Sequence, residues 1–448
     1  MTCGLMAGVA SPWRGTRRQG PPSVRLNLQI VDSHRGPAPD GAASAVSRRQ
    51  RWARLRRSLW QPPRPHGQQP RKRVVGPLEL FYDLAVVVLV AQDARHLARQ
   101  LTWRGLGEFA VIFTLVWIAW INGSLHHELH GREDARARST FLLQILVLAL
   151  MGAFIPAAGG RRGAAFAIAA GALFAILTML WLLAARGDRP QYRRSSRLFV
   201  AGTAACALLL LGTAFLPAGA RILAWGVLDA AYLTGFAAIV LTGNLVEAAA
   251  FLITDALIER FGLLIIIVLG EIMTGVVTGL ASQPVSGLTL SVGLIAVVVG
   301  FGAWWTYFDF AGHRPPRRTS AASLQWMLGH LPVTAAVAAM GAAMISLIDH
   351  AHDNRTPAAA AWITCAGAAV VLCATMLVAA SLQDWERDRG LYRPLAGTCA
   401  GAAAACLVLG LLRPTPLVLG LVLVALLSIP WGFAVARQLA SGQDSPVA

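Results

Sequence analysis

The sequence predicts an all-α polytopic membrane protein with about twelve transmembrane helices, and two observations lead to this prediction. Of the 448 residues, 56% are hydrophobic and 14% are charged, whereas about a quarter of the residues of a soluble domain are charged. Apolar stretches of about 20 residues, the length that crosses a bilayer as an α-helix, recur from Leu78 onward. Ordinary soluble enzymes and binding modules are therefore excluded, and the lipid bilayer is the first partner that the sequence implies.

Residues 1–77 form a separate basic segment. They contain 15 of the 39 Lys and Arg residues against two acids, Asp32 and Asp40, so most of the net charge of +17 belongs here and does not indicate a nucleic-acid partner. The segment is rich in Arg, Pro, Gly, Ser and Gln without apolar periodicity, which predicts a disordered cytoplasmic tail. No apolar run follows its basic stretches, so a signal peptide is not predicted; a misassigned start codon would give the same pattern.

Twelve apolar runs follow the tail, and each is predicted to span the membrane as one helix. They lie at about 78–98, 106–124, 139–158, 163–185, 198–217, 222–245, 260–280, 287–310, 323–347, 358–381, 394–412 and 415–436. The first six make up one half of the membrane domain (78–245). The other six belong to the second half (246–448), which ends in a short C-terminal tail.

The charges of the connecting loops predict the orientation. With the basic tail inside, fifteen basic residues fall in the inside loops and eight in the outside loops. Because an excess of positive charge marks the cytoplasmic side, both termini are expected to be cytoplasmic.

A faint internal repeat relates the two halves. The segment 79–89 (ELFYDLAVVVL) aligns with 259–269 (ERFGLLIIIVL) at an offset of 180 residues, and the next helix of each half carries paired tryptophans. These pairs are Trp117 with Trp120 and Trp304 with Trp305. Two parallel six-helix repeats, related by an axis along the membrane normal as in some transporters, would explain the pattern, although apolar helices also resemble each other by chance.

Glu271 is the most informative ionisable residue, because charged groups inside a membrane are rare and by default functional. It lies eleven residues into its apolar run, which is about 16 Å at 1.5 Å per residue and close to the midplane. Thr274, Gly275 and Thr278 follow at helical spacing and are expected to share an inward face with Glu271. The alternative is a helix-packing seam, in which Gly275 and Gly279 allow close approach.

Glu79 and Asp83 lie four residues apart at the start of the first predicted helix, so they share one face. Two adjacent carboxylates raise each other's affinity for protons, and burial adds to this effect. Such a pair suits a proton or cation site. The alternatives are that Glu79 is an acid favoured at a helix N-terminus, and that both carboxylates pair with an arginine.

Four further polar residues are predicted near the cytoplasmic ends of the membrane helices: Asn122, Glu259, Asp309 and His330. With the carboxylates of the first helix, they are expected in the inner half of the membrane, and the sequence leaves open whether they converge. A single histidine in an apolar helix is more often a hydrogen-bonded core residue than a ligand.

The sequence predicts no catalytic residue, no metal and no cofactor. The segment 126–130 (HHELH) has histidines four residues apart, but His127 stands where a zinc-protease motif needs glutamate. A surface loop is expected there instead. The six cysteines show no CxxC spacing, which argues against a zinc or redox site.

Four blocks of sequence stand out in order: PLELFYDL (77–84), IERFG with VLGE (258–262 and 268–271), WWTYFD (304–309) and GHLP (329–332). They resemble the bacterial low temperature requirement protein A family over residues 75–436, with Tyr82 where the family pattern has phenylalanine. The resemblance implies a multi-pass protein of the bacterial inner membrane, named for growth in the cold. It brings no substrate and no mechanism.

A carboxylate at the midplane agrees best with a secondary transporter of an unknown small solute or cation. Proton coupling is an option for such a transporter. Glu271 would be the central group, with Thr274 beside it and Glu79 and Asp83 as proton or cation sites. The alternative is a membrane-embedded lipid-modifying enzyme or envelope scaffold that supports growth in the cold, with the inner-half acids and His330 as acid/base groups. A homo-oligomer is compatible with either.

Overall fold

The computed structural model describes residues 52, 60–66, 75–132, 134–242 and 253–441. Contacts divide the chain into residues 1–52 and 53–448, and all the helices below belong to the second unit. Most of the predicted tail (1–77) and the predicted boundary between the halves at 245/246 lie outside the described residues. The described stretch 60–66 hydrogen-bonds to residues 130–134, so this part of the tail is packed rather than disordered.

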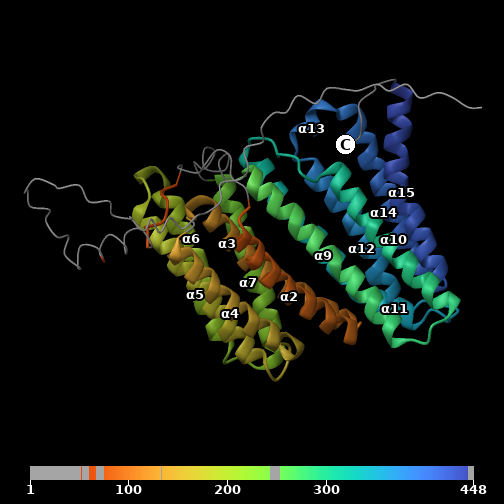
Figure 1. Cartoon of the computed structure of the whole chain (residues 1–448), viewed down its shortest axis with the longest axis horizontal. Helices are drawn as coiled ribbons and strands as arrows, with labels where there is room; N and C mark the ends of the chain where they lie inside the picture. Colours follow the sequence, from red (N-terminus) through yellow and green to blue (C-terminus); the bar gives the residue numbers. More distant parts are fainter. Residues whose placement is uncertain (1–51, 53–59, 67–74, 133, 243–252, 442–448) are drawn as a thin grey trace, which may run out of the picture. The chain divides into compact units, whose positions relative to one another are not determined.

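Within the described residues, twelve long helices account for the predicted runs (Figure 1). The first half holds α2 (Pro77–Arg99), α3 (Trp103–His130), α4 (Ala135–Phe154), α5 (Gly163–Gly187), α6 (Arg193–Thr213) and α7 (Ala218–Thr242). The second half holds α9 (Asp255–Ser282), α10 (Gly287–Phe310), α11 (Ser320–Asp349), α12 (Ala358–Ala379), α14 (Arg389–Leu412) and α15 (Pro416–Ser441). Shorter elements are η1 (Ile155–Ala157), η2 (Pro190–Tyr192) and α13 (Gln383–Arg387). The described residues contain no named β-strand.

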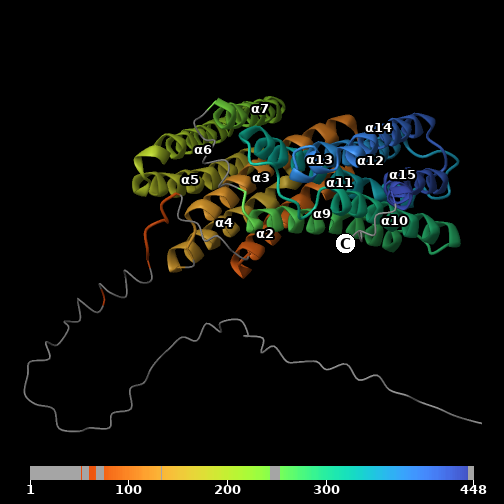
Figure 2. The ribbon, with the colours of Figure 1, turned by 90° about the horizontal axis from the view of Figure 1, so that it is seen from above.

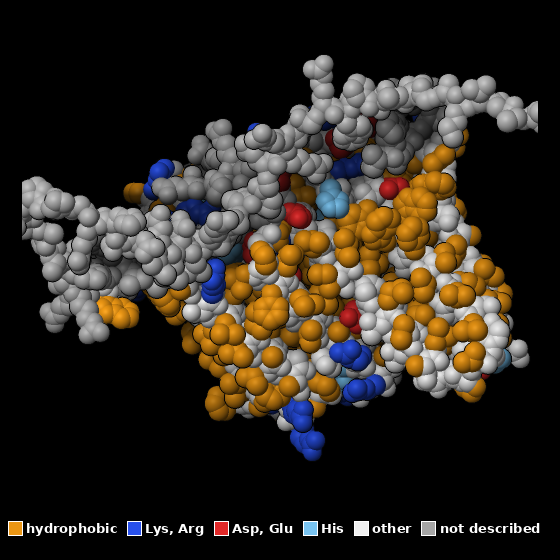
Figure 3. All heavy atoms as spheres, viewed as in Figure 1, with side chains coloured by type: hydrophobic (Ala, Val, Ile, Leu, Met, Phe, Trp, Pro, Cys, Tyr) orange, Lys and Arg blue, Asp and Glu red, His pale blue; other side chains and the backbone are white. Residues whose placement is uncertain are grey.

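Eleven of the twelve long helices are long and apolar enough to cross a membrane. The exception is α2, because Glu79, Asp83 and Asp93 interrupt its apolar stretch. Large apolar side chains such as Leu208 and Leu294 are exposed on the helices, and hydrophobic side chains cover much of the face in Figure 3. Such a surface is suited to lipid rather than water, and the prediction of an all-α polytopic membrane protein is confirmed.

Side-chain caps explain where several helices begin. The hydroxyl of Thr102 accepts a hydrogen bond from the backbone N–H of Gly105 at the start of α3, and Asp134 caps α4 in the same way. Thr254, Ser286 and Thr319 cap α9, α10 and α11. These residues satisfy backbone donors that have no partner within a helix. The helices α3, α4, α9 and α11 therefore start a few residues before their apolar runs, whereas α10 starts with its run.

The two halves share one pattern of helix packing (Figures 1 and 2). In the first half, α2 packs on α3 and α4, α3 on α5 and α7, α4 on α5, α5 on α6, and α6 on α7. In the second half, α9 packs on α10 and α11, α10 on α12 and α15, α11 on α12, α12 on α14, and α14 on α15. Each contact of the first half therefore has a counterpart between the corresponding helices of the second.

The halves meet through α2, which packs on α9 and α11, and through contacts of α3 and α7 with α11. The first helix of each half thus contacts its counterpart. Because Asp83 and Arg260 lie near the starts of α2 and α9 and bind each other, these two helices begin at the same end of the bundle. We call this end inner and the opposite end outer.

The helices α9 and α11 cross closely at Gly275 and Gly341. A Cβ atom built on Gly275 would lie 2.2 Å from the carbonyl oxygen of Gly341, and one built on Gly341 would lie 2.8 Å from the backbone of Glu271. Only glycine fits at this crossing, which places the backbone of Glu271 directly against α11. The packing seam that the sequence offered as an alternative is therefore present.

Candidate functional site

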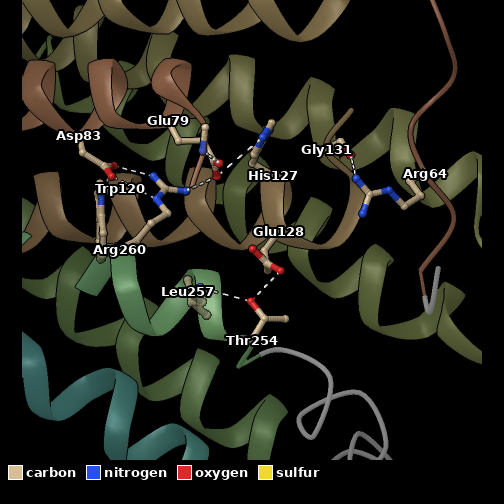
Figure 4. A network of polar contacts seen from close by, with 11 residues as sticks. Arg64, Glu79, Asp83, Trp120, His127, Glu128, Gly131, Thr254, Leu257 and Arg260 are labelled. Atoms are coloured by element: carbon tan, nitrogen blue, oxygen red, sulfur yellow. Dashed lines mark hydrogen bonds and ion pairs between the residues drawn. The ribbon is translucent and has the colours of Figure 1, made fainter. Parts of the chain in front are cut away.

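The inner ends of α2 and α9 are joined by a buried charge cluster of Glu79, Asp83 and Arg260 (Figure 4). The Arg260 guanidinium donates from Nε to Asp83 Oδ2 at 3.1 Å, from Nη2 to Asp83 Oδ1 at 2.5 Å, and from Nη1 to Glu79 Oε1 at 3.3 Å. All three side chains are at most 2% exposed. One guanidinium of the second half is thus shared by two carboxylates of the first half, a geometry that the planar fork of arginine favours.

Aromatic and titratable groups of α3 complete this cluster. The indole Nε1 of Trp120 donates to Asp83 Oδ1 at 2.8 Å, and the guanidinium carbon of Arg260 lies 5.9 Å from the centre of the Trp120 ring. His127 Nε2 lies 3.7 Å from Glu79 Oε1. Glu79 therefore lies between the guanidinium of Arg260 and the imidazole of His127.

Glu79 and Glu128 also have local structural roles. Glu79 Oε2 accepts a hydrogen bond from the backbone N–H of Gly76 at 2.9 Å, which fixes the start of α2. Glu128, nearly fully buried at the end of α3, accepts a hydrogen bond of 2.8 Å from the hydroxyl of Thr254, the residue that caps α9 (Figure 4). The contact between Glu128 and Thr254 ties the end of α3 in the first half to the start of α9 in the second. The helix-terminus and arginine-pairing alternatives for Glu79 and Asp83 are both seen in the structure.

Phe261, which follows Arg260, joins the charge cluster to a second polar pair. Its ring centre lies 4.9 Å from that of Trp120 and 4.6 Å from that of His330. The Tyr307 hydroxyl lies 2.8 Å from His330 Nε2, and His330 Nδ1 lies 2.6 Å from the carbonyl oxygen of Trp326. A backbone carbonyl only accepts, so Nδ1 donates to it and the neutral ring accepts from Tyr307 at Nε2. His330 is therefore a hydrogen-bonded core residue.

Glu271 lies at the α9–α11 crossing, and its predicted face is only partly correct. The side chain is buried, and Arg95 of α2 attracts it electrostatically. Gly275 is also buried, but Thr274 and Thr278 are exposed, and the Thr274 hydroxyl donates to the carbonyl of Gly270 in its own helix. The expected inward face with Thr274 and Thr278 is therefore wrong, and Glu271 lies at the edge of the buried sector.

The other predicted inner-end residues do not join the charge cluster. Asn122 donates to the carbonyl of Ile118 and accepts a hydrogen bond of 2.7 Å from the Tyr232 hydroxyl on α7. The half-buried Asp309 accepts a 2.6 Å hydrogen bond from the Trp305 indole within α10. Glu259 is half-buried and forms none of the described side-chain hydrogen bonds.

A second set of ionisable residues, which the sequence analysis did not single out, lies at the outer end. A cavity of about 370 Å³ is lined by His96 and Gln100 of α2, by Arg104 and Glu108 of α3, and by Pro156, Ala157, Gly159 and Gly160. Glu108 accepts a hydrogen bond of 3.0 Å from Arg104 and lies 3.7 Å from His96 Nε2. The cavity therefore combines two cationic or titratable groups with a carboxylate.

Asp93 lies one helical turn before His96 and is 1% exposed. Neither of its carboxylate oxygens has a hydrogen-bond partner among the described residues, and Glu108 acts on it electrostatically. A charged carboxylate buried without a partner is strongly unfavourable, so the group must be neutral or hold a ligand. An aspartate within an apolar run, three residues before a histidine, is the sequence signal that could have found it.

The segment 126–130 is not a surface loop. These residues form the last turns of α3 and are all buried, because residues 60–66 and the end of α5 cover them: His66 and Asp188 both contact His130. The prediction of a loop was wrong because hydropathy alone does not reveal burial by distant segments.

Comparison with known families identifies the chain. A family model described as "Bacterial low temperature requirement A protein (LtrA)" matches residues 74–429, more than half of the sequence. The chain belongs to the LtrA family. In this LtrA protein, the sequence block 77–84 binds the block 258–262 through Asp83 and Arg260. The block 304–309 binds the block 329–332 through Tyr307 and His330. Comparison with the curated proteins gives no match.

Proposed function

We propose that this LtrA protein is a secondary transporter of a small solute and that transport is coupled to protons. The observation that carries the proposal is the buried cluster in which Arg260 of one half is held by Glu79 and Asp83 of the other. In transporters built from repeats, one bundle of helices rocks against the other around a site at their interface. A charge cluster at this interface is well placed to respond to, and control, such movement.

The shared packing pattern supports two parallel six-helix repeats as the moving units. Seven helix contacts of the first half have counterparts in the second, and the two first helices, α2 and α9, contact each other. A duplication of this kind accounts for the sequence offset of 180 between Glu79 and Glu259. The loop charges further support cytoplasmic termini, and the family supports the bacterial inner membrane.

Glu79 is the proposed link between protons and movement of the halves. Its carboxylate is 3.3 Å from the Arg260 guanidinium and 3.7 Å from the His127 imidazole. A proton on His127 increases its attraction for Glu79 and competes with Arg260, so protonation weakens the hold of one half on the other. Release of that proton from His127 restores the full attraction between Glu79 and Arg260.

Glu271 and Asp93 are the proposed proton-binding carboxylates away from the inner end. Glu271 is buried at the α9–α11 crossing, where the positive charge of Arg95 attracts it. Asp93 is buried near the outer cavity. Asp93 lies on α2 and Glu271 on α9, and these two helices join the halves. A change in the charge of either residue therefore acts on the same interface as the Arg260 cluster.

The test is proton movement in liposomes that contain the purified protein, measured with an internal pH dye and a panel of small solutes. We expect a solute-dependent pH change that Glu271→Gln abolishes. The matched control is Glu386→Gln, since Glu386 is an exposed carboxylate on α13, and this variant should transport like the wild type. A solute-dependent pH change that persists in Glu271→Gln would remove Glu271 from the mechanism.

The lipid-modifying or scaffold alternative has less support in the described residues. His330, its proposed acid/base group, has both ring nitrogens engaged by Tyr307 and Trp326, and the inner-end polar residues lie at separate positions. Absence of flux from folded wild-type protein, together with altered lipid composition in a deletion strain, would favour this alternative over transport.

A further inference from the structure

Three buried side chains from separate parts of the chain meet at the inner end, away from the Arg260 cluster. They are His66 from the segment before α2, His130 at the end of α3, and Asp188 just after α5. Each is at most 3% exposed. One nitrogen or oxygen atom from each residue lies within 4.8 Å of the corresponding atoms of the other two.

Neighbouring groups hold these side chains in place. Asp188 Oδ1 accepts a hydrogen bond of 2.8 Å from the backbone N–H of His66, and Oδ2 accepts one from the Ser196 hydroxyl. His130 Nδ1 lies 2.8 Å from the carbonyl oxygen of Arg64, to which it donates. Metal-binding histidines characteristically donate the N–H of one ring nitrogen to a backbone carbonyl or carboxylate and bind the metal through the other.

The remaining ring nitrogens are buried without partners. Nε2 of His66 and Nε2 of His130 have no hydrogen-bond partner among the described residues, although buried polar atoms are normally paired. A neutral imidazole has a lone pair on one of its two ring nitrogens, so these unpartnered Nε2 atoms are candidate metal ligands.

We propose that His66, His130 and Asp188 form a binding site for a divalent transition metal of the zinc type. Two imidazole nitrogens and one carboxylate oxygen are ligands that zinc accepts, with a fourth position for water. The ligand atoms of a tetrahedral zinc site lie roughly 3.3 Å apart, so metal binding would draw the three side chains closer together than they lie in this structure. The positive charges of Arg64 and Arg136 act on His130, so the negative charge of Asp188 is essential to the site.

The bound metal would fasten the segment 60–66 to the inner ends of α3 and α5. This segment is already aligned by hydrogen bonds from Arg64 N–H to the carbonyl of His130 and from Gln61 N–H to Asp134. The His66 ring also stacks on Tyr192, with ring centres 4.1 Å apart. The fold thus already brings together the three segments that supply the proposed ligands. The metal site does not depend on the transport proposal.

The experiment uses full-length, tag-free protein purified in detergent, freed of metal with a chelator and titrated with Zn²⁺ alone against a chromophoric competitor. We expect about one high-affinity Zn²⁺ per chain, a rise in the unfolding temperature with Zn²⁺, and visible absorption bands of tetrahedral Co²⁺ when Co²⁺ replaces it. His66→Ala and Asp188→Asn should each weaken binding by at least about 10-fold.

The matched control is His352→Ala, because His352 is an exposed histidine elsewhere in the chain, and it should bind Zn²⁺ like the wild type. If Asp188→Asn fails to fold, His66→Ala decides, since His66 lies outside the helices. The proposal is overturned if folded wild-type protein binds Zn²⁺ no more tightly than His66→Ala does, or if His352→Ala loses binding to the same extent.

Discussion

Asp83 of α2 and Arg260 of α9 form a two-point ion pair that is almost fully buried and that joins the two halves of the protein. The pair is 177 residues apart in sequence. Glu79 adds a third hydrogen bond to the same guanidinium, and Trp120 orients Asp83. A contact of this kind specifies how the halves meet, and it stabilises them only while both charges are present.

Removal of one partner of this ion pair should lower the stability of the folded protein. We expect Asp83→Asn and Arg260→Gln each to lower the free energy of unfolding by about 3–5 kcal/mol, because each leaves a buried charge with fewer partners. The double variant should lose less than the sum of the two. Unfolding of the purified proteins in detergent measures all three, and strictly additive losses would show that the two residues are not coupled.

The crossing of α9 and α11 predicts opposite results for two glycines of α9. Gly275→Ala should destabilise strongly, because its Cβ would lie 2.2 Å from the carbonyl oxygen of Gly341 and the backbones would have to separate. Gly270→Ala meets nothing within 4 Å, so it should be neutral or stabilise by up to about 1 kcal/mol through helix propensity. Thermal unfolding compares the two, and equal effects would argue against the close crossing.

Tyr82 is the position at which the chain departs from the family pattern. It is fully buried, and its hydroxyl has no hydrogen-bond partner among the described residues. A buried unsatisfied hydroxyl costs about 1–3 kcal/mol, so Tyr82→Phe should raise the free energy of unfolding by about 1 kcal/mol. A loss of stability would mean that the hydroxyl has a partner, such as an ordered water molecule.

The helices could be predicted from sequence because the bilayer imposes a length on each apolar run. The run at 287–310 coincides with α10 (Gly287–Phe310). The run at 106–124 falls short of α3, which continues to His130. The last turns of α3 are polar, and only distant segments bury them, so no local pattern marks them as helix.

The site was predicted less completely than the fold, for reasons of geometry. Glu79 and Asp83 were found as buried acids, but Arg260 was not identified as their partner, because nothing local relates residues 177 positions apart. On α9, successive residues are separated by about 100°. Thr274 therefore lies about 60° to one side of Glu271 and Gly275 about 40° to the other. Only the side with Gly275 packs on α11, and sequence spacing alone does not say which side is buried.

Asp93 should behave in the opposite way to Asp83 when its charge is removed. Both carboxylates are buried on α2, but Asp83 is paired with Arg260, whereas Asp93 has no hydrogen-bond partner among the described residues. Because Asn has the shape of Asp and carries no charge, Asp93→Asn avoids the cost of burying a charge and should unfold at the wild-type temperature or above.

Transport gives the second measurement on the same variant. If Asp93 takes up protons near the outer cavity, Asp93→Asn should abolish the solute-dependent pH change in liposomes while the protein remains fully folded. A stable Asp93→Asn protein with wild-type proton movement would show that Asp93 is a neutral packing residue. A protein that unfolds as readily as Asp83→Asn would instead show that Asp93 has a cationic partner. The two readouts separate a proton site from a structural carboxylate, which neither stability nor transport distinguishes alone.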